Sequence, residues 1–169
     1  PIYIASDIHL GVAPPETEQA FLRWLDHTAE CASELILNGD IFDFWFEYRS
    51  VIPRGHTRVL GALADLVDRG VRVTIMAGNH DWWGGSFFSE EIGLTFLQDP
   101  VLRDLHGFQT FLAHGDGLGR GDVGYQLLRT LVRSRLTRWL FSWLHPNLGI
   151  AIAARVSQTE HSPGGPSKA

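Results

Sequence analysis

The chain has 169 residues, 44% of them apolar, and a formal net charge of −5. This length suits one domain with a hydrophobic core and is short for two. A single cysteine cannot form an internal disulfide, which argues against a disulfide-stabilised extracellular scaffold and favours a reducing, intracellular setting. The acidic balance argues against a nucleic-acid partner, because phosphates attract a basic protein face.

The charge is divided unevenly along the chain. Residues 1–116 carry 17 acidic and 7 basic side chains, whereas residues 117–169 carry 2 and 7. Thirteen of the 14 basic residues are arginines, which suit a bidentate grip on phosphates or carboxylates but are also common on surfaces. Together with a change in apolar pattern, this predicts a core over residues 1–120, a helical cap over 121–158 and a linker-like tail over 159–169.

Four short apolar runs predict β-strands, and two stretches with helical spacing separate the first three runs. The first helical stretch follows Pro14-Pro15, a start signal, and the second ends at Gly70, a residue type that terminates helices. This alternation predicts a parallel α/β core. The predicted strands are 2–5, 34–37, 71–76 and 109–113, and the predicted helices are 20–29 and 59–67.

Two further apolar runs, at residues 94–97 and 101–105, predict additional strands near the fourth one. His106-Gly107 is typical of the turn between the second of these runs and the fourth strand. We expect the four principal strands to end at one edge of the core.

After Gly121, leucines and tryptophans at helical spacing alternate with arginines, which predicts the helical cap. The spacing leaves open whether these apolar side chains form a core or line a ligand pocket. The longest uncharged run covers residues 139–154 and is shorter than the roughly 20 residues of a membrane-spanning helix. We therefore expect contact with a membrane surface rather than a span.

Each of the four principal strands leads into a short polar cluster. Because the carboxyl ends of parallel strands meet at one edge, we expect the clusters to converge. One cluster alone is more typical of a turn than of a ligand, but four in order favour a shared site. Their carboxylate, imidazole and amide groups suit Mn²⁺, Fe²⁺, Zn²⁺, Co²⁺ or Mg²⁺ without selecting among them. The clusters are Asp7-Ile8-His9, Gly39-Asp40, Gly78-Asn79-His80-Asp81 and His114-Gly115-Asp116.

These blocks, in this order, resemble the signature of the calcineurin-like metallophosphoesterases over about residues 2–116. The resemblance implies an α/β fold in which two packed sheets are flanked by helices (α/β/β/α), with the helical cap as an insertion. It also implies two divalent metal ions, for which we expect Mn²⁺, and hydrolysis at phosphorus. By this resemblance Asp7, His9 and Asp40 hold one ion, and Asp40, Asn79 and His114 hold part of the second.

Residues 39–46 and 114–126, followed by the arginine-rich cap, resemble more narrowly the UDP-2,3-diacylglucosamine diphosphatases of lipid A synthesis. That family hydrolyses the pyrophosphate of an acylated nucleotide sugar to UMP and 2,3-diacylglucosamine 1-phosphate. The resemblance implies a cytoplasmic protein, peripheral at the inner membrane, whose cap accepts the acyl chains. It implies Asp122, Tyr125 and Ser157 as substrate contacts. The wider superfamily resemblance adds Asn79 and His80 as substrate contacts, with His80 as the catalytic residue.

The chain departs from this pattern at two places. The diphosphatases commonly have arginine where this chain has His80, the residue of the wider superfamily and a candidate general acid. This leaves the reaction class intact but opens the choice of substrate. The superfamily signature also ends with a Gly-His-x-His block, which does not follow His114 here. We expect that the last core strands are missing and that metal binding is weak; a degenerate metal site is the alternative.

Two other functions remain open: a general metal-dependent phosphodiesterase or phosphatase acting on soluble substrates, and a metal-free scaffold of the same fold. The intact ligand set argues against the scaffold, because buried polar groups without partners are costly. Neighbouring residues also have two interpretations. Aromatic residues beside the clusters either line the site or pack in the core, and nearby aspartates either orient ligands and backbone amides or cap turns. These residues are Phe42, Phe44, Trp45, Phe46, Trp82, Trp83, Asp43, Asp81 and Asp116.

Overall fold

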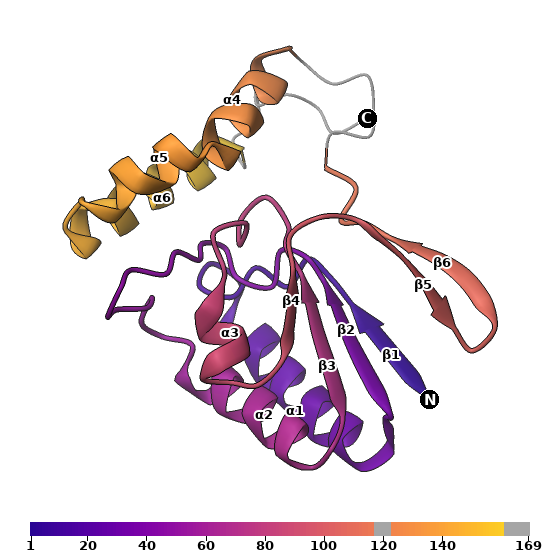
Figure 1. Cartoon of the computed structure of the whole chain (residues 1–169). Coiled ribbons are helices and arrows are strands. Elements are labelled where there is room, and N and C mark those ends of the chain that lie inside the picture. The colour runs from indigo at the N-terminus through magenta and orange to yellow at the C-terminus, as the bar shows by residue number, and fades with distance from the viewer. Residues whose placement is uncertain (117–122, 161–169) are drawn as a thin grey trace.

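The structure is a computed structural model, which describes residues 1–116 and 123–160. A four-stranded sheet carries helices on one face and a β-hairpin on the other, and three helices lie across the carboxyl ends of its strands (Figure 1). The elements are β1 (Ile2–Ala5), α1 (Pro15–Cys31), β2 (Glu34–Asn38), α2 (Thr57–Asp68), β3 (Arg72–Met76), α3 (Ser86–Glu90), β4 (Thr95–Leu97), β5 (Val101–Leu105), β6 (Phe108–Leu112), α4 (Val123–Arg133), α5 (Arg135–Ser142) and α6 (Pro146–Glu160).

The first sheet is parallel throughout, with the strand order β1-β2-β3-β4. Its two central strands are almost continuously apolar and buried, as expected for strands covered on both faces. The three strands predicted at 2–5, 34–37 and 71–76 are confirmed. The strand predicted near 94–97 lies elsewhere than expected, because it pairs with β3 at the sheet edge and not with the fourth predicted strand.

Helices α1 and α2 cover one face of this sheet. Their buried side chains, among them Phe21, Leu25 and Leu63, pack with Leu35 and Ile75 of the central strands. α1 begins with proline at its first position, which is compatible with the free backbone N–H groups there. Beyond the end of α2, Gly70 adopts φ +86, a left-handed conformation that favours glycine. Both helical predictions are confirmed.

The fourth predicted strand belongs to a second sheet. β6 pairs antiparallel with β5, and Val101 lies opposite Leu112. The predicted turn at His106-Gly107 is confirmed: it folds β6 back on β5, so the fourth predicted strand joins a separate antiparallel sheet and not the parallel one. The inner face of the hairpin packs against Ile36 and Met76 of the first sheet. The two sheets thus form the predicted sandwich.

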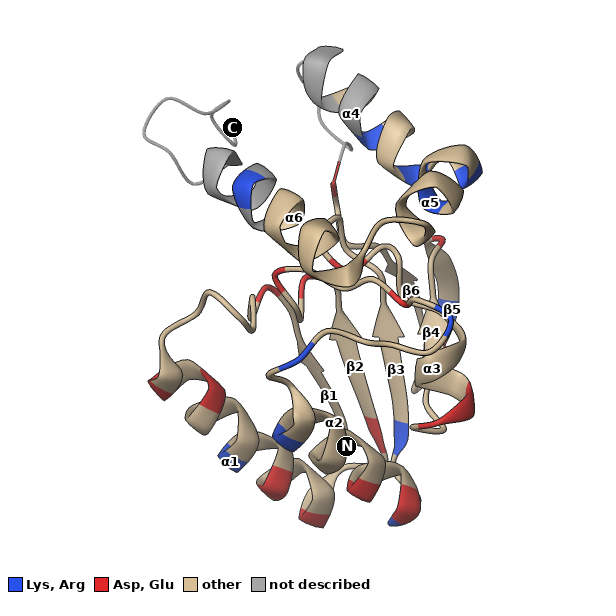
Figure 2. Cartoon of the chain, turned by 90° about the vertical axis from the view of Figure 1, so that its left-hand side faces the viewer, with Lys and Arg blue, Asp and Glu red and all other residues tan. Residues whose placement is uncertain are grey.

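A buried carboxylate at the first residue of β2 joins the two sheets. Glu34 of β2 forms ion pairs with Arg72 of β3, at 3.1 Å, and with Arg103 of β5, at 2.7 Å. Figure 2 shows an acidic and a basic position side by side at the lower ends of β2 and β3. The sequence signal for this link is a charged residue at the start of an otherwise apolar strand.

We expect Glu34→Gln to lower the free energy of unfolding by about 2 kcal/mol, because a buried group loses a charge-assisted partner. Urea unfolding of both proteins measures the change. Glu30→Gln, on the exposed side of α1, is the control and should stay within about 0.5 kcal/mol of the parent. A loss at Glu34 as small as that of the control would contradict the proposed link between sheets.

Three cap helices follow the core. α5 starts at Ser134, whose hydroxyl accepts a hydrogen bond from the Thr137 backbone N–H at 3.2 Å. Phe141 of α5 packs on core aromatic rings, with its centroid 4.7 Å from that of Phe46 and 4.8 Å from that of Trp83. In α6 the buried Gly149 leaves no room for a side chain beside Phe141. Of the described helices, none is long and apolar enough to cross a membrane.

Candidate metal centre

The polar clusters extend the strands that precede them. The loop after β1 runs beside the loop after β2: Asp7 N–H donates to the Gly39 carbonyl at 3.0 Å, and Ile8 N–H donates to the Asp40 carbonyl at 2.9 Å. From the second sheet, the Ala113 carbonyl accepts a hydrogen bond from the Asn38 side chain at 3.0 Å. Segments from both sheets therefore meet at the carboxyl end of β2.

Backbone strain is concentrated in this region. Among the described non-glycine residues with positive φ are Asp7 at 55°, His9 at 51° and Asp40 at 53°, all three predicted metal ligands. Such conformations cost free energy for residues with a Cβ atom and persist where the surrounding structure enforces them. Non-glycine residues held in such conformations cluster at functional sites, which favours a functional role for this edge of the parallel sheet.

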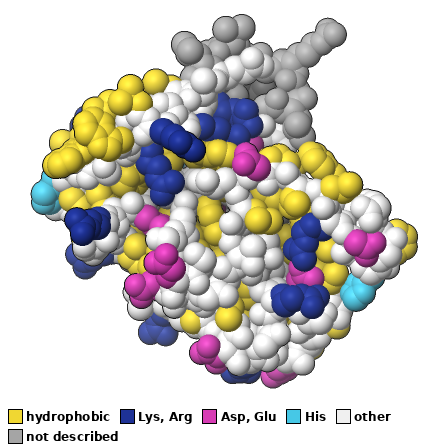
Figure 3. All heavy atoms as spheres, viewed as in Figure 1, with side chains coloured by type: hydrophobic (Ala, Val, Ile, Leu, Met, Phe, Trp, Pro, Cys, Tyr) yellow, Lys and Arg dark blue, Asp and Glu magenta, His cyan; other side chains and the backbone are white. Residues whose placement is uncertain are grey.

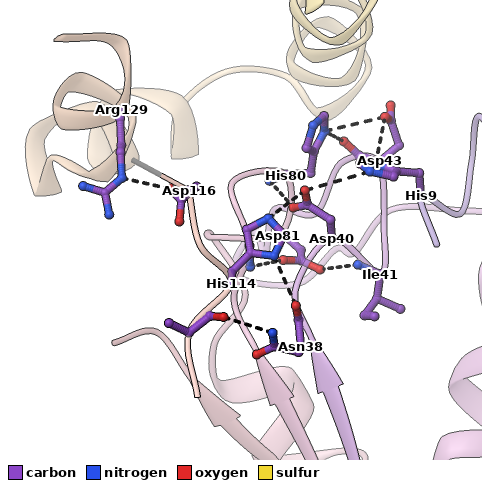
Figure 4. Close-up of polar contacts among 12 residues, drawn as sticks. His9, Asn38, Asp40, Ile41, Asp43, His80, Asp81, His114, Asp116 and Arg129 are labelled. Carbon is purple, nitrogen blue, oxygen red and sulfur yellow. Dashed lines mark hydrogen bonds and ion pairs between the residues drawn. The ribbon is translucent and has the colours of Figure 1, made fainter. Parts of the chain in front are cut away.

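Asp40 lies at the centre of the cluster, with 1% of its surface exposed. One carboxylate oxygen, Oδ2, is 3.0 Å from His114 Nε2 and 3.9 Å from His9 Nε2. The other, Oδ1, accepts the His80 backbone N–H at 3.0 Å. Figure 4 shows these side chains pointing toward one another from different loops.

Two groups of donor atoms suitable for a metal ion share Asp40. One combines His9, Asp40 and His80, and the other combines Asp7, Asp40 and His114; within each group the atoms lie within 4.8 Å of one another. The structure therefore places Asp40 where it can bridge two ions, but it groups Asp7 with His114 and His9 with His80. Oxygen and imidazole donors around a buried carboxylate fit a divalent cation without thiolate ligands.

The other expected site residues are placed less completely. Asn79 is half-buried in the loop after β3, directly after Gly78. Asp122 lies outside the described residues. Tyr125 and Ser157 fall on α4 and α6, where their side chains also lie outside the described part of the chain. Their roles remain predictions.

Two glycines allow the loops to approach one another closely. A Cβ atom at Gly39 would overlap the His114 ring, and one at Gly78 would overlap the Asp40 carboxylate. Gly39 also has φ +86, which a side chain would disfavour. The glycines of the Gly39-Asp40 and Gly78-Asn79 pairs thus leave the space that the His114 ring and the Asp40 carboxylate occupy.

Hydrogen bonds orient the ligand side chains. His114 Nδ1 lies 3.1 Å from the Asn38 carbonyl, and His80 Nδ1 lies 2.7 Å from the Asp43 carbonyl. A carbonyl only accepts, so both Nδ1 atoms carry the proton and Nε2 is left for the site. Asp81 is fully buried and accepts from the backbone N–H groups of Gly78 and Ile41.

Burial and neighbouring charges set the protonation states of the cluster in the absence of a cation. Burial opposes the charged form of His114, but the hydrogen bond and charge of Asp40 raise its pKa to about 9. Burial likewise opposes ionisation of Asp40, yet His114 and the His80 N–H leave its pKa lowered. At His9 burial dominates and lowers the pKa. The metal-free centre therefore holds a charged His114–Asp40 pair beside a neutral His9.

We expect cation affinity to rise about tenfold per pH unit up to pH about 9, because a cation must displace the His114 proton. Titration with Mn²⁺ at pH 6.5, 7.5 and 8.5 measures this slope. The same raised pKa stabilises the metal-free fold below pH 6.5, and this contribution is lost as the pH rises through about 9. An affinity independent of pH over this range would contradict His114 as a ligand.

Three of the six aromatic neighbours are buried in the core: Phe42, Trp45 and Phe46 are at most 1% exposed. Phe44, Trp82 and Trp83 are half-buried. His56, directly before α2, is also buried, with its ring 4.8 Å from that of Phe42. Its environment was invisible in the sequence because its aromatic contacts come from another segment.

A model of the calcineurin-like phosphoesterase family matches residues 1–150. The chain belongs to this family, so the predicted membership and fold class are confirmed. The family implies divalent metal ions, for which the two ligand groups are candidates.

Curated relatives carry a more specific name. The chain is similar to the UDP-2,3-diacylglucosamine hydrolase of Porphyromonas gingivalis, with 36% identity over 96% of this chain and 64% of the relative. It is 38% identical to the protein of that name from Aeromonas salmonicida, over 89% of this chain and 59% of the relative. With the enzyme of that name from Haemophilus ducreyi it shares 35% identity over 91% of this chain and 65% of the relative. The chain thus spans about three-fifths of the length of these relatives.

Proposed function

We propose that this chain forms the metal-binding core and cap of a hydrolase acting on UDP-2,3-diacylglucosamine. The products are UMP and 2,3-diacylglucosamine 1-phosphate. The observation that carries the proposal is the pair of ligand groups sharing the buried Asp40, at the edge covered by an apolar helical cap. The shared name of the similar curated proteins supports this choice of substrate.

Asp7, His9, Asp40, Asn79 and His114 are proposed to hold two divalent cations, preferably Mn²⁺. Bound cations supply Lewis-acid polarisation of a phosphoryl oxygen and a nucleophile at neutral pH. Asp40 would be shared between the two positions, and the other protein ligands would be Asp7, His9, Asn79 and His114. Five protein donors would leave part of the two coordination shells to other groups, so we propose modest cation affinity.

His80 is the proposed proton donor to the leaving phosphate oxygen. Its Nδ1–H donates to the Asp43 carbonyl, so a neutral ring carries no proton on Nε2. Proton delivery from Nε2 therefore requires the imidazolium, which the Asp43 carboxylate oxygen stabilises at 3.6 Å. The other proposed substrate contacts are Asn79, Asp122, Tyr125 and Ser157.

The cap provides an apolar surface suited to acyl chains and to a bilayer. On the face shown in Figure 3, hydrophobic side chains gather over the cap helices with basic groups beside them. This combination is typical of helices that lie on anionic membranes, and we propose attachment at the cytoplasmic face of the inner membrane. The exposed apolar residues of the cap are Leu131, Leu136, Trp139, Leu140, Trp143, Leu148, Ile150 and Ile152.

We expect Trp143→Ala to weaken binding to vesicles containing anionic lipid by at least about tenfold, because insertion of a large apolar side chain is worth about 1.5–3 kcal/mol. Vesicle co-sedimentation measures the loss, and turnover of an acylated substrate should fall more than that of a soluble phosphodiester. Phe108→Ala, on the hairpin, is a matched control because both side chains are 76% exposed. Equal losses in the two variants would contradict a membrane role for the cap.

Product analysis tests the proposed reaction. The chain is incubated with Mn²⁺ and UDP-2,3-diacylglucosamine, and released UMP is compared with hydrolysis of an activated soluble phosphodiester. Preferential UMP release, abolished by a chelator, supports the proposal. Equal activity on both substrates favours a general phosphodiesterase of the family, and a protein that binds no cation favours the scaffold.

A further inference from the structure

Asp116 connects a metal-ligand loop to the cap. It lies two residues after His114, and its Oδ2 accepts Arg129 Nε at 2.8 Å and Arg133 Nη2 at 2.6 Å. Both arginines belong to α4 and are four residues apart, so they project from the same side of the helix. Figure 4 shows Asp116 and Arg129 beside the converging ligands.

The last turn of α4 also contacts the other ligand loop. The Arg133 guanidinium carbon lies 3.7 Å from the centroid of the Trp82 ring. Trp83 Nε1 donates to the Val132 carbonyl at 2.9 Å. Both tryptophans directly follow His80 and Asp81, so this turn of α4 holds the segment that leaves the loop after β3.

These two loops come from different sheets: β3 belongs to the parallel sheet and β6 to the hairpin. Their relative position decides whether His114 and His80 both reach Asp40. We infer that Arg133, by holding Asp116 and Trp82 together, is a positioning residue for the metal centre. The inference rests on the proposed metal centre and is independent of the proposed substrate.

The geometry requires an arginine at this position. A planar guanidinium can stack on an indole ring and donate to a carboxylate in the same conformation, whereas a lysine ammonium is a compact point charge. Loss of groups that orient metal ligands typically costs about 10- to 100-fold in metal affinity. Arg133→Gln should therefore weaken cation binding by breaking the link between Asp116 and Trp82, although Arg129 still contacts Asp116.

Cobalt binding tests the inference, because Co²⁺ reports both affinity and ligand geometry through its visible absorption. In the whole chain, we expect Arg133→Gln to weaken Co²⁺ binding about tenfold and to shift the absorption bands. Arg133→Lys keeps the positive charge, but the Co²⁺ absorption bands should still differ from those of the wild type. Arg135→Gln is the matched control: it removes the same charge from an exposed position at the start of α5 and should leave both readouts unchanged.

A second variant keeps the test independent of folding at Arg133. Asp116→Asn should produce the same band shift, and its combination with Arg133→Gln should weaken Co²⁺ binding little more than either change alone, because both act through one contact. Wild-type affinity and bands in Arg133→Gln, or additive losses in the double variant, would overturn the inference. If Arg133→Gln fails to fold, wild-type bands in Asp116→Asn would overturn it.

Failure of the substrate proposal gives a different result. Absence of UMP release with normal Co²⁺ binding in the parent chain would contradict the proposed reaction and leave the Arg133 result intact. Absence of Co²⁺ binding in the parent chain would overturn the metal centre and, with it, the role of Arg133.

Discussion

Asp40→Asn is expected to remove cation binding and phosphoester hydrolysis together. The substitution preserves size but replaces a charged oxygen with an amide NH₂ group, which cannot bind a cation. Asp40 contributes to both ligand groups, so one change depletes both positions. Loss of a residue that only orients a ligand typically lowers metal affinity about 10- to 100-fold. Loss of the shared ligand Asp40 should therefore lower it more than about 100-fold.

Calorimetric titration with Mn²⁺ measures affinity, and release of inorganic or nucleotide phosphate measures turnover. Asp65→Asn is the matched control, because Asp65 lies exposed on α2 and pairs with Arg69 far from the strand ends. The Asp40→Asn variant should also lose the charged pair with His114, so metal-free stability needs to be measured in parallel. Near-normal turnover in Asp40→Asn would show that Asp40 does not bridge the two ions.

Gly78→Ala is expected to impair the centre by steric means alone. The added methyl group would overlap the Asp40 carboxylate and crowd its backbone nitrogen, which lies 2.5 Å from the Cβ position. Either Asp40 or the loop after β3 must move, and both carry predicted ligands. We expect cation affinity to fall at least about tenfold, together with a loss of stability of about 1–3 kcal/mol from overpacking.

Gly61→Ala separates this effect from a general response to glycine substitution. Gly61 lies within α2, where an added Cβ meets no atom within 4 Å. Alanine there should preserve cation binding and stabilise the helix by about 0.5–1 kcal/mol. Thermal unfolding and Mn²⁺ titration of both variants provide the comparison. Wild-type affinity in Gly78→Ala would mean that the loops are farther apart in solution than the contact at Asp40 requires.

The parallel core was predictable because its signals are local. Continuous apolar runs indicate buried strands, helical spacing indicates the covering helices, and Gly70 marks a helix end. The ligand clusters were recognisable for the same reason: each follows directly on a strand, and their order resembles a family signature. The convergence of the first three clusters follows from parallel strands that end at one edge, whereas His114 reaches Asp40 from the second sheet.

Other features depend on contacts between distant segments. The turn between β5 and β6 was predictable from His106-Gly107, but their separation from the parallel sheet was not, because membership of a sheet depends on which backbone edge is free to pair. The grouping of Asp7 with His114 depends on the left-handed backbone at Asp7, which no residue pattern predicts. In the sequence, Phe42 and Trp45 are equally compatible with lining the site and with packing in the core. Their ring contacts with Phe88 of α3 place both in the core.

Residue types and their spacing predicted the kinds of group in this protein: hard oxygen and imidazole donors at the ends of buried strands, followed by an arginine-rich helical segment. Folding alone decided which donors face one another, and that Asp116 and Trp82 are joined through Arg133. The physical reason is range. Spacing along the chain reports backbone periodicity, whereas the distance between side chains from two sheets is set by packing of the whole core.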